Sequence, residues 1–361
     1  MSLQTDFLSL VKLGIGHDAG FQPAGVDWKA LDGLAVRQGL VAVLQDAVER
    51  LVAEGVAPAD LAIDESVREQ WIVDVLQAYE GRYVQTVDTI GEMASFYNSH
   101  GIRMMVLKGW SCSLDWPRPD HRPCGDIDIW LFGRQKEADA ALRKEMGIQV
   151  DTSHHHHTVF YWRDLMVENH YNLLNVYHHR STRELESIMK RLASDDSISR
   201  ELNGVKVYLP SADFHALFLL RHAMSHFAST DITLRQLLDW AFFVRKHGAE
   251  VDWTNLEKEV ERFGMKRLYD IFNAICVEDL GFADSVFPHA TVDRELKSRV
   301  LHEILKPEFD EESPKGLLRR IVFKYRRWKA NGWKHELCYS DSMWSAFWSG
   351  VWSHILKPSS I

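Results

Sequence analysis

Apolar residues recur at spacings of three and four along much of the first 100 residues, a pattern that predicts helices. One periodic stretch covers residues 27–55 and ends at Gly55. A longer one runs from about Ser66 to Asn98, where the sequence NSHG supplies helix-ending residues. Helical spacing returns at residues 134–147 and dominates from about Thr182 onward, so we expect helices on both sides of the centre of the chain.

Between these helical parts the pattern changes to short β-type runs. IRMMVL (102–107) and DIDIWL (126–131) are separated by a proline-rich loop. HTVFYW (157–162) and LMVENHYNL (165–173) are separated by only Arg-Asp, which predicts a hairpin or a tight two-strand turn. A last strand-like run, GVKVYLP (204–210), interrupts the C-terminal helices.

These patterns together predict an α+β fold, and the length of 361 residues allows two or three structural units. We expect residues 101–180 to form a small α/β core with a mixed sheet. Residues 1–100 are expected to form a helical region that packs on this core, and residues 181–361 a mainly helical C-terminal domain.

Two carboxylates occupy a run that otherwise has the pattern of a buried strand. Side chains two apart in a strand point the same way, so Asp126 and Asp128 share one face, and the intervening isoleucines share the other. Glu168 and His170 alternate in the same manner on a second strand. If the two strands are neighbours, three carboxylates converge, a ligand set that suits Mg²⁺. A solvated edge strand is the alternative explanation of the DxD pattern taken alone.

Possible phosphate ligands flank this acidic pair. Lys108 and Gly109 form a turn directly after the first β run, where backbone N–H groups and the ammonium could meet phosphate oxygens. Arg122 precedes the acidic pair and is a further donor of the type that binds phosphate.

The stretch LKGWS…HRPCGDIDIWL, residues 107–131, resembles the nucleotide-binding signature of the polymerase-β-type nucleotidyltransferase superfamily. It is most similar to the family of uncharacterised nucleotidyltransferases. That resemblance extends to Glu168-Asn169-His170, to LLRHAMSHF and LRQLLDW in the C-terminal half, and to DWKALDGLAVRQGLVAVL near the start.

The resemblance implies a nucleotidyltransferase core with a defined role for each matching residue. Asp126 and Asp128 match the metal-binding pair, and Glu168 matches the third carboxylate, which binds metal or activates the acceptor hydroxyl. His170, beside these acids, is a candidate for positioning or proton transfer. The residues expected to bind the nucleotide are Lys108, Gly109, Ser111 and Arg122. The usual Gly-Ser turn is here Lys-Gly-Trp-Ser, with Ser111 two residues late.

The activity implied by the resemblance is transfer of a nucleoside monophosphate from an NTP to a hydroxyl or phosphate acceptor, by a two-metal mechanism with Mg²⁺ or Mn²⁺. A small molecule or a peptide is the expected acceptor. Two alternatives remain open: a tRNA- or protein-modifying enzyme of toxin type, and a nucleotide-binding or scaffold protein that keeps the fold without turnover.

Charge and composition narrow the expected partners and location. The 42 basic and 51 acidic residues give a net charge of −9, so stable binding of nucleic acid is not expected. We expect neither a secretory signal nor a transmembrane segment, and the four scattered cysteines fit reduced thiols in the cytoplasm. A stripe of tryptophans predicts a buried helix and consists of Trp344, Trp348 and Trp352. Because the stretch at 315–335 is basic and amphipathic, docking on a membrane surface is the alternative interpretation.

Histidines are concentrated in two places. The run SHHHH at 153–157 precedes a strand and predicts a solvated turn that could bind transition metals adventitiously, although His157 could also reach the nucleotide or the acceptor. His222 and His226 are one helical turn apart, but the sequence offers no third zinc ligand beside them. We therefore expect them to line the cleft between the centre of the chain and the C-terminal helices.

Overall fold

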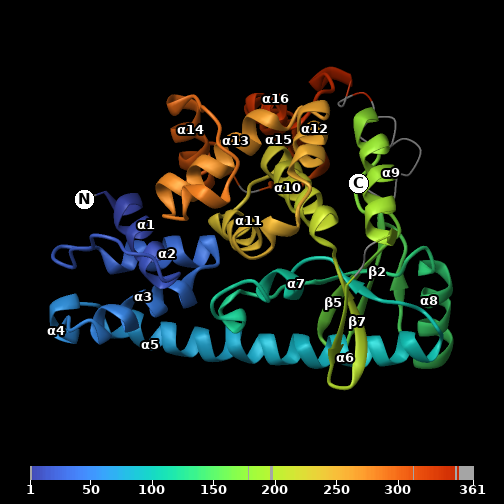
Figure 1. Ribbon diagram of the computed structural model, residues 1–361, viewed down its shortest axis with the longest axis horizontal. Helices are drawn as coiled ribbons and strands as arrows, with labels where there is room; N and C mark the ends of the chain where they lie inside the picture. Colours follow the sequence, from blue (N-terminus) through green and yellow to red (C-terminus); the bar gives the residue numbers. More distant parts are fainter. Residues whose placement is uncertain (1, 178, 196–197, 312, 346–347, 349–361) are drawn as a thin grey trace. The chain divides into compact units, whose positions relative to one another are not determined.

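The computed structural model describes residues 2–177, 179–195, 198–311, 313–345 and 348. It has the α+β architecture that the sequence predicts, with many helices and one mixed sheet (Figure 1). The chain forms two compact units. The first comprises Met1–Val75, Leu220–Gly248 and Trp253–Ser340, and the second comprises Leu76–Leu219, Ala249–Asp252 and Asp341–Ile361.

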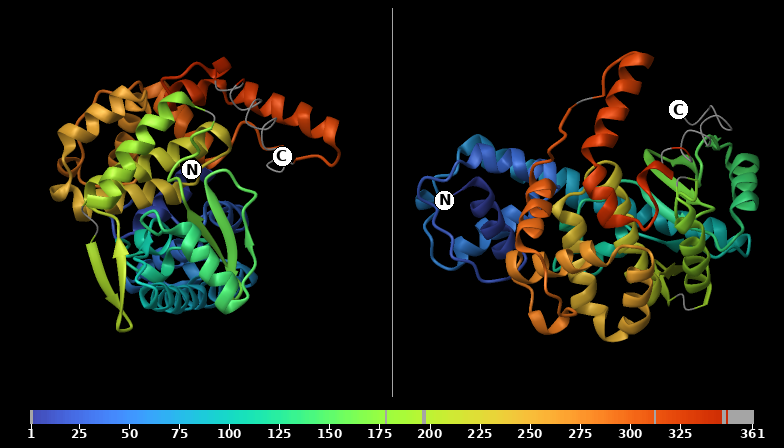
Figure 2. Two further views of the ribbon diagram at one scale, coloured as in Figure 1. Left: turned by 90° about the vertical axis from the view of Figure 1, so that its right-hand side faces the viewer. Right: turned by 90° about the horizontal axis from the view of Figure 1, so that it is seen from above.

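The second unit contains a seven-stranded sheet with the order β3-β4-β5-β2-β1-β7-β6. The β2–β5 and β1–β7 pairs are parallel, and the other neighbours are antiparallel. The hairpin β6–β7 therefore forms one edge of the sheet and β3–β4 the other (Figure 2). The strands are β1 Met105–Val106, β2 Ile127–Trp130, β3 Val150–Asp151, β4 His157–Trp162, β5 Leu165–His170, β6 Ile198–Leu202 and β7 Val205–Leu209.

Every β-type run predicted from the sequence contains a strand of this sheet, although only Met105–Val106 of the run 102–107 is a strand. Two strands were not predicted, for different reasons. β3 has only two residues, too few to show a periodicity. β6 is an exposed edge strand of mainly polar sequence, ISREL, so it lacks the alternation that marks a half-buried strand.

Helices of the second unit cover one face of the sheet. Ile127, Ile129 and Val167 point to this face and belong to one buried cluster with Met93 and Tyr97 of the long helix α6, which crosses the sheet in Figure 1. Since side chains alternate along a strand, burying the isoleucines directs Asp126 and Asp128 to the opposite face. The helices of this unit are α6 Arg82–Ser99, α7 Trp110–Ser113, α8 Gln135–Ala141 and α9 Arg180–Asp195, with the short turns η2 Pro119–His121 and η3 Leu142–Met146.

The hairpin predicted around Arg163-Asp164 is confirmed. Strands β4 and β5 pair from Trp162↔Leu165 at the turn to His157↔His170 at the other end. Arg163 has a φ of 56°, in the left-handed region, and its guanidinium pairs with Glu92 of α6. Asp164 Oδ1 accepts a hydrogen bond of 2.7 Å from Gln85 Nε2 of the same helix. Side-chain contacts with α6 thus hold a turn that has no strong turn sequence.

The first unit is helical. Its elements are α1 Leu3–Gly14, α2 Trp28–Gln38, α3 Val41–Ala53, α4 Pro58–Leu61, α5 Glu65–Asp74, α11 Leu234–His247, α12 Trp253–Arg262, α13 Lys266–Ala274, η5 Ile275–Asp279, η6 Asp284–Val286, α14 Arg294–Leu305, α15 Leu317–Ala330 and α16 Gly332–Cys338. Helix α10 Ala212–Ser229 and the π-helical turn η1 Val75–Gly81 cross the boundary between the units, and η4 Gly248–Glu250 follows α11.

The periodic stretches of the N-terminal region form helices with one difference. Residues 27–55 make two helices, because Gly39 adopts a left-handed conformation, with φ 66°, and ends α2. The stretch from Ser66 to Asn98 is helical throughout, as α5, η1 and α6.

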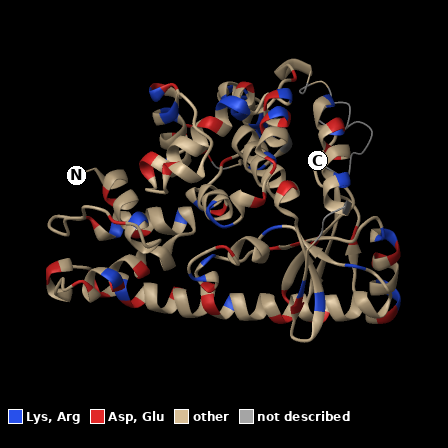
Figure 3. Ribbon diagram, viewed as in Figure 1, with Lys and Arg blue, Asp and Glu red and all other residues tan. Residues whose placement is uncertain are grey.

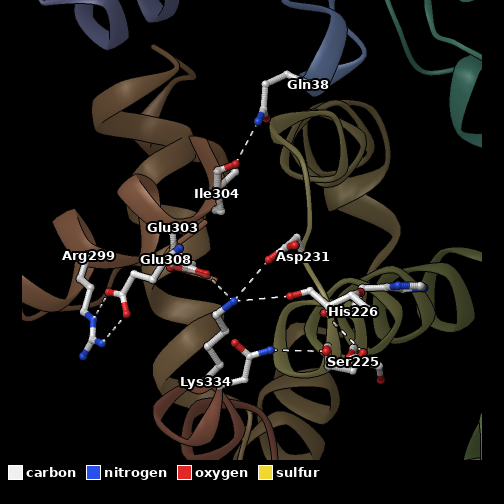
Figure 4. Close-up of polar contacts among 12 residues, drawn as sticks. Gln38, Ser225, His226, Asp231, Arg299, Glu303, Ile304, Glu308 and Lys334 are labelled. Carbon is white, nitrogen blue, oxygen red and sulfur yellow. Dashed lines mark hydrogen bonds and ion pairs between the residues drawn. The ribbon is translucent and has the colours of Figure 1, made fainter. Parts of the chain in front are cut away.

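A buried ion pair joins helices of the first unit. Lys334 of α16 and Glu303 of α14 are each 1% exposed and contact each other, and Lys334 Nζ also lies 3.4 Å from Asp231 Oδ1 after α10 (Figure 4). Near it, Arg299 and Glu308 form a pair that is open to solvent. The Lys334–Glu303 pair links segments that are far apart in the sequence.

The predicted burial of the tryptophan stripe is wrong for the residues that can be examined. Trp344 and Trp348 are 61% and 58% exposed, and Trp352 lies outside the described residues. Periodic apolar residues define a helix face, but the pattern does not supply an element to cover that face. Among the described helices, none combines the length and the apolar character that crossing a bilayer requires.

Candidate functional site

The two strands that carry the predicted acids are direct neighbours. β2 and β5 run parallel in a register that sets Asp128 opposite Glu168 and Trp130 opposite His170. One ligating atom from each of Asp128, Glu168 and His170 lies within 4.8 Å of the other two. The expected convergence of carboxylates from two strands is therefore present in the structure for Asp128 and Glu168.

Asp126 joins this group through a lysine. It precedes β2, and its Oδ2 lies 3.8 Å from Lys108 Nζ, which also contacts Asp128 Oδ2 directly. Lys108 is next to the acids because β1 pairs with β2, and the Leu107 amide donates to the Asp128 carbonyl at 2.9 Å. Burial disfavours the ammonium, but Asp128 and Asp126 outweigh that effect and raise the pKa of Lys108.

Asp128 also binds a second cation. His170 Nε2 lies 3.0 Å from Asp128 Oδ1 and 3.5 Å from Glu168 Oε2. Burial opposes the imidazolium, yet the hydrogen bonds to Asp128 and Glu168 raise the pKa of His170 to about 9, so the ring is charged at neutral pH. Despite its own burial, the pKa of Asp128 is lowered by Lys108 and His170.

The other two carboxylates respond differently to the same surroundings. Burial tends to raise the pKa of Glu168, but the hydrogen bond from His170 opposes this effect, and the pKa is lowered overall. Burial and the negative charge of the neighbouring Asp128 raise the pKa of Asp126, and the charge of Glu168 adds to this effect. The three carboxylates are thus electrostatically distinct, and Asp128 is the one most firmly ionised.

The predicted nucleotide ligands lie in the loop between β1 and β2. Gly109 has a φ of 69°, and a Cβ there would lie 3.5 Å from the Asp126 carbonyl oxygen, so this turn passes close to the acids. Ser111, in α7, is buried, and its Oγ bonds to no described residue. Arg122 is buried, and its Nη1 donates to the Pro123 carbonyl at 3.1 Å. The structure thus brings Lys108 and Gly109 to the acids and buries Ser111 and Arg122 within the loop.

Residues that the sequence did not single out hold the acidic strand from behind. Asp139 of α8 accepts hydrogen bonds from Asn169 Nδ2 at 2.8 Å and from Thr158 Oγ1 at 3.0 Å. Gln135 of the same helix donates to the His170 carbonyl at 2.8 Å. A signal for this network was present, because Asn169 alternates with Glu168 and His170 and so had to be buried on the core side, where it needs a partner.

The histidine run lies beside the acids. His157 begins β4, directly opposite His170, and its Nε2 is 3.6 Å from Glu168 Oε1. Burial lowers the pKa of His157 to about 4 against the opposing effect of Glu168, so its ring is neutral at pH 7. His222 and His226 of α10 have ring centroids 4.5 Å apart and join no group of three potential ligands among the described residues.

Asp126, Asp128 and Glu168 together are called the acidic group below. Their donor atoms are compatible with a hard divalent cation. Carboxylate oxygens are the ligands that Mg²⁺ and Mn²⁺ prefer, and Asp128 and Glu168 offer them from rigid neighbouring strands. The ammonium of Lys108 shows that a positive charge is already stabilised beside Asp126 and Asp128.

Comparison with known proteins identifies a family for this chain. A family model described as uncharacterised nucleotidyltransferase matches residues 24–281. A solved structure, an antigenic nucleotidyltransferase-like protein from Paracoccidioides brasiliensis, is similar over 56% of this chain and 95% of that chain, with 14% identity and a TM-score of 0.34. No curated protein matches the chain significantly. Since the matched segment spans most of the sequence, including both acidic strands, the chain belongs to the family of uncharacterised nucleotidyltransferases.

Proposed function

We propose that this protein transfers a nucleoside monophosphate from an NTP to a hydroxyl or phosphate acceptor, with Mg²⁺ or Mn²⁺ held by Asp126, Asp128 and Glu168. The observation that carries the proposal is the pairing of Asp128 with Glu168 across two parallel strands, in a member of this family. These carboxylates would hold two such ions, which would supply positive charge to the phosphate oxygens during an in-line displacement.

Lys108 and Gly109 support the triphosphate in this proposal. Lys108 keeps its charge at neutral pH because its pKa is raised, so it can pair with phosphate oxygens as well as with the acids. Gly109 gives the turn a backbone conformation that other residues rarely adopt, and it leaves no side chain between the turn and Asp126. Arg122 and Ser111 are assigned to the same function as more deeply buried donors of the loop.

His170 is a positioning residue in this scheme. Its imidazolium holds one oxygen of Asp128 and one of Glu168, which fixes both carboxylates on one face of the sheet. A protonated ring at pH 7 is a hydrogen-bond donor and not a general base, so it does not accept the proton of the acceptor hydroxyl.

The acceptor is proposed to be a small molecule or a peptide. The net charge is −9, and acidic and basic residues are interspersed along helices such as α8 and α5 (Figure 3). Such a surface lacks the broad positive field that usually draws a protein to nucleic acid.

The test is pyrophosphate release together with transfer of label from each α-labelled NTP. Acceptors are supplied as separate metabolite, peptide, tRNA and protein fractions, with Mg²⁺, with Mn²⁺ or with a chelator. A labelled product that needs a divalent ion and is lost in Asp126→Asn supports the proposal. A labelled tRNA or protein would instead identify the toxin-type alternative.

A second candidate is a nucleotide-binding protein without turnover. One observation favours it: both oxygens of Asp128 are already engaged by Lys108 and His170, so a metal ion would have to compete with two cations of the protein. Calorimetry separates the two functions. Saturable NTP binding with neither pyrophosphate nor labelled product from any fraction would replace the enzyme proposal with this one.

A further inference from the structure

Three histidine rings meet at one end of the β4–β5 hairpin. His156 directly precedes β4, His157 is its first residue, and His170 is the last residue of β5. His157 and His170 lie directly opposite each other in the antiparallel β4–β5 pair, so their rings are neighbours on the same face of the sheet. One ring nitrogen from each of the three residues lies within 4.8 Å of the other two.

Two of these rings have buried nitrogens that the protein leaves unused. Nδ1 of His156 and Nδ1 of His157 are buried and hydrogen-bond to no described residue. His157 is 6% exposed, which leaves its ring little access to water. A buried polar atom without a partner costs free energy, and a ligand that uses the nitrogen lone pair removes that cost.

A carboxylate completes the surroundings of the rings. Glu168 Oε1 lies 3.6 Å from His157 Nε2, and Glu168 Oε2 lies 3.5 Å from His170 Nε2. Carboxylates in this position orient histidine ligands of metal ions or add a fourth ligand. Imidazole nitrogens suit zinc, cobalt, nickel and copper, whereas magnesium prefers oxygen.

We propose that His156, His157 and His170 form a binding site for a transition-metal ion of the zinc type. This site shares His170 with the acidic residues but takes nitrogen ligands, and His170 releases its proton when the ion binds. The site is part of the folded hairpin and is not a property of the histidine run as such. Within that run, His155 contacts the ring of Tyr177, with centroids 4.8 Å apart, and does not belong to the three. This proposal does not depend on the transferase activity, and its test therefore measures metal binding.

The experiment uses the full chain without an affinity tag, freed of metal with a chelator and dialysed. Co²⁺ is titrated and followed by its visible absorption, and Zn²⁺ is then added as a competitor. We expect one Co²⁺ to bind per chain, with a visible absorption spectrum typical of nitrogen ligands. Zn²⁺ should displace the bound Co²⁺, and excess Mg²⁺ should not. His156→Gln, His157→Gln and His170→Gln should each weaken binding at least about tenfold, since even the loss of an outer partner of a metal ligand costs about 10–100-fold.

The matched control is His155→Gln, a substitution of the same type in the same run, which should leave the affinity for Co²⁺ unchanged. Asp126→Asn should also retain Co²⁺ binding, which separates this site from the acidic group. Equal losses in His155→Gln and His157→Gln would mean simple chelation by the run and would overturn the proposal, as would unchanged binding in His170→Gln.

A second measurement covers the case in which a variant fails to fold. In the unsubstituted chain, long-range ¹H–¹⁵N spectra of the imidazoles report which ring nitrogens bind Zn²⁺. The proposal requires changes at His156, His157 and His170. A spectrum in which only other histidines respond contradicts it.

Discussion

Lys108 and Asp128 form a buried ion pair at the centre of the acidic group. The Asp128 side chain is 1% exposed, whereas that of Asp126, two residues earlier, is 34% exposed and lies 3.8 Å from the same ammonium. The two aspartates of the DxD sequence therefore have different energetic roles, although they have the same expected function.

The first prediction separates these roles by substitution. Asp126→Asn and Asp128→Asn should each reduce metal-dependent transfer on the order of 10²-fold or more, because each removes charge next to the reacting phosphate. Only Asp128→Asn should also destabilise the fold, by roughly 3 kcal/mol, since it removes the closest anionic partner of both Lys108 and His170. Urea unfolding at pH 7 measures the stability, and the transfer assay measures the activity.

Asp126→Asn should have unchanged or slightly higher stability, because it removes a carboxylate whose pKa is raised by burial and by Asp128. Equal destabilisation of the two variants would contradict the assignment of Asp128 as the structural member of the pair.

The second prediction concerns the dependence of stability on pH. The pKa of His170 is about 9 in the folded protein and 6.5 in an unfolded chain, so its imidazolium stabilises the fold fully below pH 6.5. That contribution, on the order of 3 kcal/mol, is lost as the pH rises from 6.5 to 9. Urea unfolding of the wild type and of His170→Gln over this range should give curves that converge toward pH 9, and parallel curves would show that His170 is not protonated in the fold.

The third prediction tests the turn beside the acids. Gly109→Ala should cost about 1–3 kcal/mol, because alanine rarely adopts a φ of 69°, while the added Cβ meets only an ordinary contact of 3.5 Å. Gly125→Ala is the matched control, since a Cβ added there would meet nothing within 4 Å and the φ of Gly125 is not in the left-handed region. Thermal unfolding of both variants provides the comparison, and equal effects would mean that backbone strain at Gly109 is not the cause.

The fourth prediction concerns the buried pair of the first unit. Lys334→Met should destabilise the protein by about 3–5 kcal/mol, because it leaves the almost fully buried Glu303 without its lysine partner. Lys334→Met combined with Glu303→Leu should recover much of this loss. Glu308→Gln breaks only the exposed pair with Arg299 and should cost less than about 1 kcal/mol. Chemical denaturation of the wild type and the three variants measures their free energies of unfolding. A double variant no more stable than Lys334→Met would contradict the prediction.

The sequence contained most of the information needed for the strands of the acidic group. The alternation of Asp126 and Asp128 with isoleucines, and of Glu168 with His170, was enough to predict the face on which each side chain lies. That β2 and β5 are neighbours could only be a hypothesis, because strand pairing between distant segments leaves no local pattern.

The contacts of charged side chains were less predictable. Lysine is a residue type that commonly binds phosphate, so the sequence favours that function for Lys108. Nothing near Lys108 in the sequence indicates that Asp128 is its partner in the folded chain. The same holds for Asp139, which belongs to an ordinary amphipathic helix but accepts hydrogen bonds from Asn169 and Thr158. Both relationships depend on how elements pack, and periodicity does not encode that.

The two-residue turn at Arg163-Asp164 sets the alignment of every pair in the β4–β5 hairpin, from Trp162↔Leu165 to His157↔His170. Since neighbouring side chains of a strand alternate between faces, one extra residue in this turn could slide β5 by a single position and turn Glu168 and His170 toward the apolar interior. The length of an exposed connection at the far end of the hairpin is therefore as strict a requirement for the acidic group as the identity of its carboxylates.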